Sequence, residues 1–339
     1  MISDALLRQL EAIAPTKRDE ALSRHTTIGI GGPADAFVSP ASASQMRDVL
    51  ALAQENGVPV FVLGSGSNIV IGDLGIRGIV IDNKATNLSG PFECSQTETQ
   101  NGAPEQQADT SARSVQGTWS ARSVQRIWWR AEAGCSFAAV SRQLSFAGYK
   151  GMEWACGIPG TIGGAVVYNA GAYGGCLGDV LLRIGVWDPE RGEAVLEAEE
   201  LGLVYRGSAF TRGLMAGKAV LWAEFALWPG DAQELRARVA DYDSRRLKAQ
   251  PRGRNAGSFF KNPAEQPAWK LLDAVGMRGY RIGGAEFSDK HCNFLINAGD
   301  ARAADVAALK REAQERVRSR FGIELENEVR LVGEGFGDD

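Results

Sequence analysis

The first quarter of the chain contains short apolar runs that are separated by glycines and interrupted by one longer amphipathic segment. The runs "ADAFVSP", "VPVFVLG" and "IRGIVID" are typical of strands, and "SASQMRDVLALAQENG" predicts a helix that ends at Gly57. Strands that alternate with a helix indicate an α/β unit. Before this unit, residues 1–24 predict one amphipathic helix followed by a connector.

Residues 86–126 differ from their surroundings because they are polar and poor in large aliphatic side chains. The pentapeptide "ARSVQ" occurs twice here, at Ala112–Gln116 and at Ala121–Gln125. Two copies do not make a repeat protein. We therefore expect a surface insertion over residues 86–126, whose role the sequence leaves open.

Strands and glycine turns resume at "RIWWRAEAG", where Trp128 and Trp129 are expected to be buried in a strand. Beyond Gly230 the pattern is helical, with amphipathic segments at "DAQELRARVADYDSRRLKAQP", "PAWKLLDAVG" and "DARAADVAALKREAQERVRSRFG". The chain is long enough for more than one core. We expect a first lobe over residues 1–84, a second lobe over 85–230 that carries the insertion, and a C-terminal unit over 231–333.

Composition narrows the class of protein. Hydrophobic residues make up 44% of the chain and charged residues 23%, and the net charge is −4, so nothing suggests a nucleic-acid partner. No run approaches the ~20 apolar residues needed to span a bilayer, and the five cysteines form no C-x-x-C pair. We expect a cytoplasmic enzyme without membrane insertion or a metal site, as a monomer or weak oligomer. The unusual number is 41 glycines against 12 prolines, which suggests backbone held close to a ligand.

The glycines gather in three clusters, "TTIGIGGPAD", "LGSGSN" and "GIPGTIGGAVVYNAGAYGG". The second cluster follows a strand, but it lacks the helix and the third glycine of a dinucleotide fingerprint. Successive backbone N–H groups in glycine turns can instead form an anion-binding concavity. Ser65, Ser67, Asn68 and Thr161 would add side-chain hydrogen bonds. The alternative is that the clusters are tight hairpins of a compact sheet, and at this density we favour ligand binding.

Motifs spread over the chain resemble, in order, those of the UDP-N-acetylenolpyruvoylglucosamine reductase family. Besides the three glycine clusters, they are "YRGS", "NAGSFFKNP", "YRIGGAEFSDKHCNFLIN" and "FGIELENEVRLVG", and they extend from about residue 24 to 333. One subgroup of that family carries an extra tyrosine-bearing loop after the strand that corresponds to "WAEFALWPG". Here the chain passes directly to "DAQELRARV", so it resembles the subgroup without that loop. The implied fold is α+β, a two-lobed FAD-binding portion of the vanillyl-alcohol-oxidase type with a smaller C-terminal α+β substrate domain.

The resemblance implies a flavin reductase that takes electrons from NADPH and acts on UDP-N-acetylglucosamine enolpyruvate in peptidoglycan precursor synthesis. The hydride passes from N5 of the reduced flavin to carbon 3, and a serine protonates carbon 2, which gives UDP-N-acetylmuramate. Carried over to this chain, Ser258 is the proton donor, Arg206 binds and polarises the substrate carboxylate, and Glu328 completes the site. Negative charge that develops next to a carboxylate needs such a donor and such stabilising groups.

The resemblance also implies binding residues. Tyr205, Lys248 and Asn262 are expected to contact the substrate, and Lys248 matches only with one possible gap. His25 and His291 are expected to be ordinary structural residues, so the FAD should be bound non-covalently. The expected cofactor-binding residues all lie in two glycine clusters: Gly64, Ser65, Gly66, Ser67, Asn68, Gly157, Ile158, Pro159, Gly160, Thr161, Gly163, Gly164, Ala165 and Asn169.

Two other functions stay open at this point. The chain could be another flavin enzyme of the same superfamily, such as an oxidase of a small alcohol or lactone. It could also be a nucleotide-binding regulator that kept the glycine turns and lost the chemistry, although such a module has no reason to keep Arg206, Ser258 and Glu328 together. Singly, each of the three has an ordinary alternative: a strand-end arginine, a turn serine, or an acid confused with Glu326.

Overall fold

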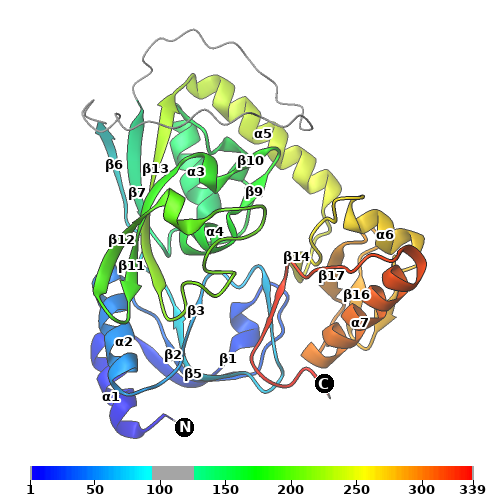
Figure 1. Ribbon diagram of the computed structural model, residues 1–339, viewed down its shortest axis with the longest axis horizontal. Helices are drawn as coiled ribbons and strands as arrows, with labels where there is room; N and C mark the ends of the chain where they lie inside the picture. Colours follow the sequence, from blue (N-terminus) through cyan, green and yellow to red (C-terminus); the bar gives the residue numbers. More distant parts are fainter. Residues whose placement is uncertain (1, 94–125, 338–339) are drawn as a thin grey trace.

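The computed structural model describes residues 2–93 and 126–337. Two lobes, each built on its own sheet, are stacked on one another, and a smaller C-terminal unit lies beside them (Figure 1). Most of the expected insertion, residues 94–125, lies outside the described ranges. None of the described helices is both long enough and apolar enough to cross a bilayer.

The first lobe is a four-stranded sheet in the order β1-β2-β5-β3, with β2, β5 and β3 parallel and β1 antiparallel at the edge. Two helices pack their buried leucine, methionine and valine side chains on the sheet. Ser3 and Ser42 cap these helices by accepting hydrogen bonds from backbone N–H groups. The elements are α1 (Asp4–Ile13), β1 (Thr16–Ala21), η1 (Leu22–His25), β2 (Pro33–Val38), α2 (Ala43–Glu55), β3 (Val60–Leu63), β4 (Ile69–Ile71) and β5 (Ile76–Asp82).

The prediction of a connector after the first helix is wrong, because Thr16–Ala21 forms strand β1. This strand pairs with β2 from Thr16 opposite Val38 to Ala21 opposite Pro33. An edge strand without a buried side chain needs no apolar alternation, so the sequence "TKRDEA" gives no strand signal.

The second lobe is a larger sheet in the order β12-β11-β13-β7-β6, with β8 paired to β13. Helices α3 and α4 cover one face and bury an apolar core against it. Residues 88–93, expected to belong to the insertion, form strand β6 at the edge of this sheet, so the insertion begins later than predicted. The elements are β6 (Leu88–Glu93), β7 (Ile127–Glu132), α3 (Phe137–Phe146), β8 (Tyr149–Lys150), η2 (Glu153–Ala155), α4 (Ile162–Tyr168), β9 (Gly171–Ala172), β10 (Gly175–Cys176), η3 (Leu177–Asp179), β11 (Leu181–Asp188), β12 (Gly192–Glu197), η4 (Ala198–Leu201) and β13 (Ala219–Pro229).

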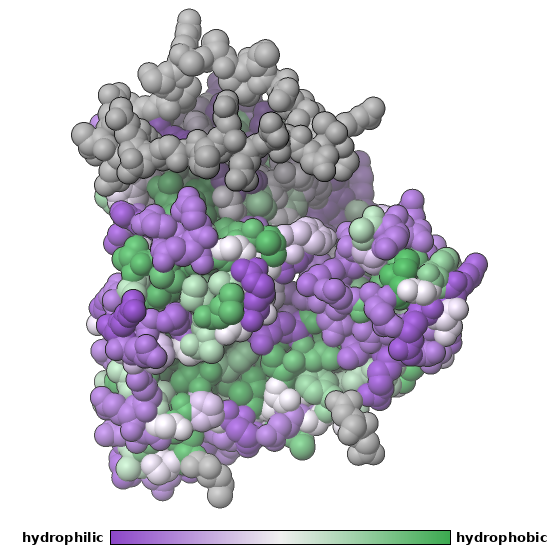
Figure 2. Space-filling model, viewed as in Figure 1, coloured by the Kyte–Doolittle hydropathy of each residue, from purple (hydrophilic) through white to green (hydrophobic). Residues whose placement is uncertain are grey.

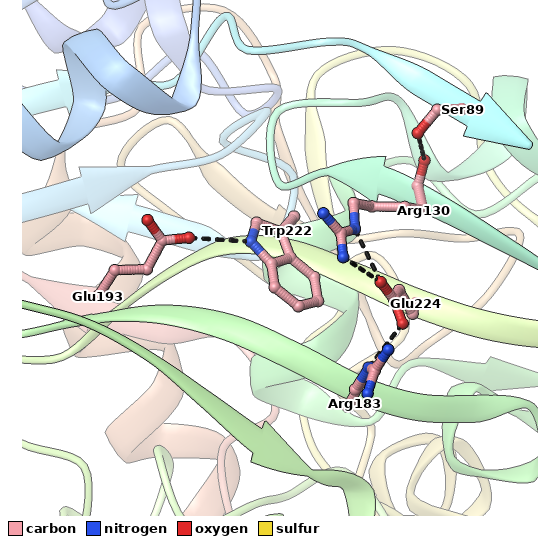
Figure 3. A network of polar contacts seen from close by, with 6 residues as sticks. All are labelled: Ser89, Arg130, Arg183, Glu193, Trp222 and Glu224. Carbon is pink, nitrogen blue, oxygen red and sulfur yellow. Dashed lines mark hydrogen bonds and ion pairs between the residues drawn. The ribbon is translucent and has the colours of Figure 1, made fainter.

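A charged row crosses the other face of this sheet at Glu224, whose carboxylate is 1% exposed (Figure 3). Arg130 of β7 donates from Nε to Oε1 over 2.8 Å, and Arg183 of β11 donates from Nε to Oε2 over 2.7 Å. The Arg130 guanidinium also lies 4.1 Å from the centre of the Trp222 ring. One buried carboxylate therefore joins three neighbouring strands, and its charge is matched from both sides.

The C-terminal unit contains a four-stranded sheet, β14-β17-β16-β15, packed against α6 and α7. It is attached to the first lobe, because β18 pairs in parallel with β4 and the Asp73 carboxylate accepts from Ala303 N at 2.9 Å at the start of α7. Helix α5 precedes this unit and packs on α3 of the second lobe. The elements are α5 (Ala232–Ala249), β14 (Asn255–Ser258), α6 (Ala268–Ala274), β15 (Arg281–Ile282), β16 (Ala285–Phe287), β17 (Phe294–Asn297), α7 (Ala303–Phe321) and β18 (Arg330–Val332).

Between the lobes and the C-terminal unit the visible face is hollowed, and apolar side chains line the floor of the hollow (Figure 2). The chain enters α5 from β13 through Gly230 and Asp231 alone, so the direct connection expected from the sequence is present. The domain boundaries themselves stay a prediction. Helix α5 lies in the sequence region expected for the C-terminal unit, but it packs on α3 of the second lobe.

Candidate active site

Two of the glycine clusters meet at the junction of the lobes. Ser67 Oγ donates to Pro159 O over 2.9 Å, and a Cβ at Gly64 would lie 2.8 Å from Thr161 Oγ1. Gly66 has a φ of +64°, and a Cβ there would lie only 2.0 Å from the backbone oxygen of His25. No other residue fits at Gly66, so the turn "GSGSN" can form only with glycine in the middle.

The residues at this junction fit a bound nucleotide cofactor. Among the described residues, none accepts a hydrogen bond from the backbone N–H groups of Ser65 to Asn68. Gly160 has a φ of +154°, and a Cβ there would meet nothing closer than Ser67 Oγ at 3.9 Å. Unused N–H donors beside open space over glycine are what the pyrophosphate of FAD requires.

Asn169 ends α4 at a φ of 43°, and its side chain is used within the protein rather than left free for a ligand. Its Nδ2 donates to Val204 O over 3.0 Å, and its Oδ1 accepts from Gly178 N at 2.9 Å. Asn169 therefore connects the third glycine cluster to the turn that carries Arg206. Its expected contact with the cofactor stays a prediction, as do those of the other residues of the two clusters.

Arg206 lies in a tight turn that Val204 and Gly207 close by exchanging backbone hydrogen bonds of 3.0 and 3.2 Å. Its φ is 52°, a conformation that costs a non-glycine residue on the order of 1 kcal/mol or more. The turn directs the guanidinium toward the C-terminal unit, where Nε lies 2.6 Å from Oε1 of Glu328. A strained backbone conformation at a non-glycine residue is typical of functional positions.

Ser258 and Glu328 are brought together by backbone pairing. Ser258 ends β14 opposite Phe294, and the next residue, Phe259, accepts from Glu328 N at 2.8 Å through its carbonyl oxygen. From the first lobe, Asn68 Nδ2 donates to Glu328 O over 3.1 Å. The three expected catalytic residues therefore come from two units, and a residue of the third unit holds one of them.

The Glu328 carboxyl has an unusual environment, with only 16% of its side chain exposed. Burial raises the pKa of Glu328 above its ordinary value, although the positive charges of Arg206 and Lys261 lower it in part. A raised pKa favours the protonated carboxyl, which can donate a hydrogen bond. Arg206 and Glu328 together thus offer a fixed cation and a carboxyl whose pKa is raised by burial.

Two of the expected substrate residues line one groove of about 460 Å³ next to the Arg206 turn. Tyr205 is 59% exposed there, and the side chain of Asn262 is held by its Oδ1, which accepts from Ala268 N at 3.0 Å. Lys248 is exposed near the end of α5, and no contact joins it to the other expected site residues that the structure describes. The lining residues are Tyr205, Lys261, Asn262, Pro263, Ala264, Glu265, Gly322, Ile323, Glu324 and Glu326.

Sequence reasoning missed residues that support the site. Asn293 holds the segment after Ser258: its Oδ1 accepts from Phe260 N at 3.0 Å and its Nδ2 donates to Phe260 O over 2.8 Å. Tyr173, at a φ of 54°, stacks on Tyr242 of α5 at 4.5 Å. Both Asn293 and Tyr173 lie inside the motifs that carried the resemblance, and this was the available signal.

The histidines have local partners. His25 Nε2 lies 2.9 Å from Glu20 Oε1, and its ring packs 4.2 Å from that of Phe37. His291 packs against Phe294 at 4.9 Å, and burial lowers its pKa. Over the described ranges, no group of three or more histidine, cysteine or acidic side chains is arranged to hold a metal ion.

Comparison with known families places two models on the chain. A model described as "FAD binding domain" matches residues 34–118 and 122–196, and one described as "UDP-N-acetylenolpyruvoylglucosamine reductase, C-terminal domain" matches residues 249–332. A UDP-N-acetylenolpyruvoylglucosamine reductase of Geobacter metallireducens is 40% identical over 322 residues, 94% of each chain. The reductase of Rubrobacter xylanophilus is 37% identical and covers 98% of this chain and 99% of its own.

A solved structure is similar over nearly the whole length. The crystal structure of UDP-N-acetylenolpyruvylglucosamine reductase from Thermus caldophilus has a TM-score of 0.70 and 30% identity, with 94% of this chain and 99% of that chain covered. With the two family models, it confirms the predicted fold: a two-lobed FAD-binding portion of the vanillyl-alcohol-oxidase type followed by a C-terminal α+β domain. The resemblance of the sequence motifs to those of the UDP-N-acetylenolpyruvoylglucosamine reductase family is confirmed as well.

Proposed function

The chain belongs to the UDP-N-acetylenolpyruvoylglucosamine reductase family, and on this premise we propose that it reduces UDP-N-acetylglucosamine enolpyruvate to UDP-N-acetylmuramate in peptidoglycan precursor synthesis. FAD is the bound cofactor and NADPH the reductant. The observation that carries the proposal is the Arg206–Glu328 pair at 2.6 Å, next to the strand that ends at Ser258. An arginine, a buried carboxyl and a hydroxyl are the groups that this reduction requires.

The junction of the glycine turns would hold the cofactor, with the free N–H groups of Ser65 to Asn68 toward its pyrophosphate. When bound, FAD supplies the hydride, from N5 of its reduced form, that adds to carbon 3 of the enolpyruvyl group. NADPH restores that hydride in a separate half-reaction. The likeness of the chain to a model of FAD-binding domains over residues 34–118 and 122–196 supports this cofactor.

Arg206 binds the substrate carboxylate with its fixed fork of N–H donors. The positive charge of Arg206, which now pairs with Glu328, is then divided between Glu328 and the substrate carboxylate. Because the charge of Arg206 lowers the pKa of Glu328, sharing it with the substrate raises that pKa further. Glu328 then holds a proton at its carboxyl and donates it as a hydrogen bond to the substrate carboxylate, where negative charge develops.

Ser258 supplies the second hydrogen of the reduction. When the hydride reaches carbon 3, the electron pair of the double bond moves toward carbon 2 and the carboxylate. The hydroxyl proton of Ser258 then passes to carbon 2, and the serine oxygen recovers a proton from solvent. A serine suits this role without a histidine base because it acts as an acid toward a carbanion-like centre, not as a nucleophile.

The test separates the two half-reactions. The FAD-loaded protein is first reduced by NADPH without oxygen, and the enolpyruvyl substrate is then added while flavin absorbance is followed. Wild-type protein should reoxidise, and in D₂O its product should carry deuterium at carbon 2. Ser258→Ala should be reduced by NADPH at the normal rate but reoxidise about 10²–10⁴-fold more slowly.

Ser319→Ala, which removes an exposed hydroxyl from α7, is the matched control and should behave as wild type. Unchanged reoxidation of Ser258→Ala would show that another group donates the proton. If the reduced wild-type flavin is not reoxidised by this substrate at all, the proposed function is wrong.

A further inference from the structure

The first glycine cluster, "TTIGIGGPAD", contains none of the expected cofactor-binding residues, although it lies against them. The backbone N–H of Thr27 donates to Gly66 O over 3.0 Å, and a Cβ at Gly66 would lie 2.7 Å from Thr26 Cα. Within the cluster, Thr26 Oγ1 donates to Ile30 O over 2.9 Å and accepts from Ile30 N at 3.2 Å, which closes a compact loop. This loop therefore supports the "GSGSN" turn from behind.

The same loop is anchored in the C-terminal unit. Ile28 and Ile30 are buried in the core of that unit, together with Phe259. Asn297, at the end of β17, donates from Nδ2 to Ile28 O over 3.0 Å. The first cluster is therefore packed between the "GSGSN" turn and the unit that carries Ser258.

The side chain of Thr27 connects these two parts directly. Thr27 Oγ1 lies 2.6 Å from Asn255 O and 3.4 Å from Gly66 O. A hydroxyl has one proton to donate, so the short contact assigns it to Asn255 O, while the backbone N–H of Thr27 holds Gly66. Thr27 thus extends from the turn expected at the pyrophosphate to the first residue of β14.

Strand β14 depends on such a contact because its pairing with β17 is irregular. The register shifts between Asn255 and Ser258, and between them Gly257 has a φ of +84°. β14 lies at the edge of its sheet, and Ser67 O of the first lobe is 4.0 Å from the position of a Cβ at Gly257. A bulged edge strand is positioned by the contacts at its ends. Thr27 supplies one of them at Asn255, three residues before Ser258.

We propose that Thr27 is a positioning residue that fixes Ser258 relative to the bound flavin. Its hydroxyl sets where β14 begins with respect to the "GSGSN" turn, and Ser258 lies at the other end of that four-residue strand. Thr27 itself takes no part in the chemistry. This inference rests on the proposed function for the role of Ser258, whereas the hold of Thr27 on β14 is tested without substrate.

The first measurement is amide hydrogen exchange of the FAD-loaded protein, followed by mass spectrometry. Thr27→Val keeps the branched shape and the backbone N–H but has no hydroxyl, so the peptide with residues 255–260 should exchange about 3- to 10-fold faster than in wild type. Thr27→Ser keeps the hydroxyl and should exchange as wild type. Thr16→Val is the matched control and should leave this peptide unchanged, because Thr16 Oγ1 also donates to a backbone oxygen, that of Ala14, but on β1.

The two half-reactions then show what the displaced strand does to the chemistry. Thr27→Val should be reduced by NADPH within about 2-fold of the wild-type rate, because its backbone N–H still holds the turn. Its reoxidation by saturating enolpyruvyl substrate should be about 10- to 100-fold slower, since a reacting group misplaced by ~1 Å costs up to ~10²-fold. KM should change by less than about 2-fold, and Thr27→Ser should restore the rate.

A double variant distinguishes positioning of Ser258 from a general loosening of the fold. If Thr27 acts through the Ser258 hydroxyl, adding Thr27→Val to Ser258→Ala should slow reoxidation by less than about 2-fold further. Equal slowing with and without the Ser258 hydroxyl overturns the inference. So does wild-type exchange or wild-type reoxidation in Thr27→Val, or a Thr27→Ser protein that is as slow as Thr27→Val.

Failure of the proposed function gives a different result. In that case the reduced wild-type flavin is not reoxidised by the enolpyruvyl substrate, and exchange of residues 255–260 alone decides. Unchanged exchange in Thr27→Val then overturns the inference as well, whereas faster exchange shows that Thr27 holds β14 against the "GSGSN" turn.

Discussion

Replacing Glu224 by glutamine tests the charged row of the second lobe. The carboxylate is 1% exposed and accepts from Arg130 and Arg183 on opposite oxygens. Glutamine keeps the shape and one acceptor, but it turns an NH₂ group toward one arginine, so a charge-assisted hydrogen bond worth ~1.5–3 kcal/mol is lost. The arginine side chains are 42% and 40% exposed, so water can solvate the released guanidinium. We expect a loss of about 2 kcal/mol, below the ~3–5 kcal/mol for breaking a fully buried pair.

At ~2.1 cal/mol/K per residue, a chain of 339 residues has an unfolding entropy of roughly 0.7 kcal/mol/K. A loss of about 2 kcal/mol then lowers Tm by about 3 °C. Circular dichroism melts of the FAD-free and FAD-loaded protein would measure it, with Glu11→Gln on the exposed face of α1 as a control that leaves Tm unchanged. Arg183→Met, which leaves Glu224 paired with Arg130, should cost less than Glu224→Gln. A Tm of Glu224→Gln within about 1 °C of wild type in both forms would refute the reasoning.

Three further outcomes follow from the structure. Burial raises the pKa of Glu328 in the folded protein above its unfolded value of 4.5, so folding favours the neutral carboxyl. The resulting stabilisation is complete below pH 4.5 and is lost as the pH rises through the folded pKa. Glu328→Gln should therefore raise Tm at pH 7, lose this advantage near pH 4, and lower kcat. Burial raises the pKa of Cys135 and Cys156 to about 11 and that of Cys292 to about 12, so peptide mapping after iodoacetamide at pH 8 should find these thiols unmodified in native protein and alkylated in urea. Asp73→Ala removes the cap on α7 and should cost ~1 kcal/mol by thermal unfolding, with part of the loss restored in Asp73→Asn.

Much of the fold follows from local pattern. The helices α2, α5 and α7 have apolar stripes and end at residues that stop helices, and the strands β3 and β5 are short apolar runs bounded by glycine or proline. The strands that were missed are edge strands. Among the described residues, β1 and β6 pair on one side only in their sheets, so polar side chains cost them little and the period-2 signal is absent.

The candidate site could be found from the sequence only through the resemblance. Arg206, Ser258 and Glu328 are separated by long stretches, and the contacts that join them are backbone pairings between distant segments, such as Glu328 N with Phe259 O. No local periodicity reports such a pairing. The strained φ of Arg206 was equally hidden, because positive φ at arginine has no compositional signature, unlike at glycine.

Attachment of the C-terminal unit to the first lobe limits how the site can close around a ligand. β18 pairs with β4, Asp73 caps α7, and Asn68 holds the backbone of Glu328, so Ser258 and Glu328 are fixed relative to the "GSGSN" turn. Arg206 belongs to the second lobe, and its link to that unit is the ion pair with Glu328, which a substrate carboxylate would weaken. The second lobe is also held to the first, because Leu221 and Trp222 of β13 share a buried core with α1 and α2. Adjustment to the substrate should therefore be local, at the contact between Arg206 and Glu328.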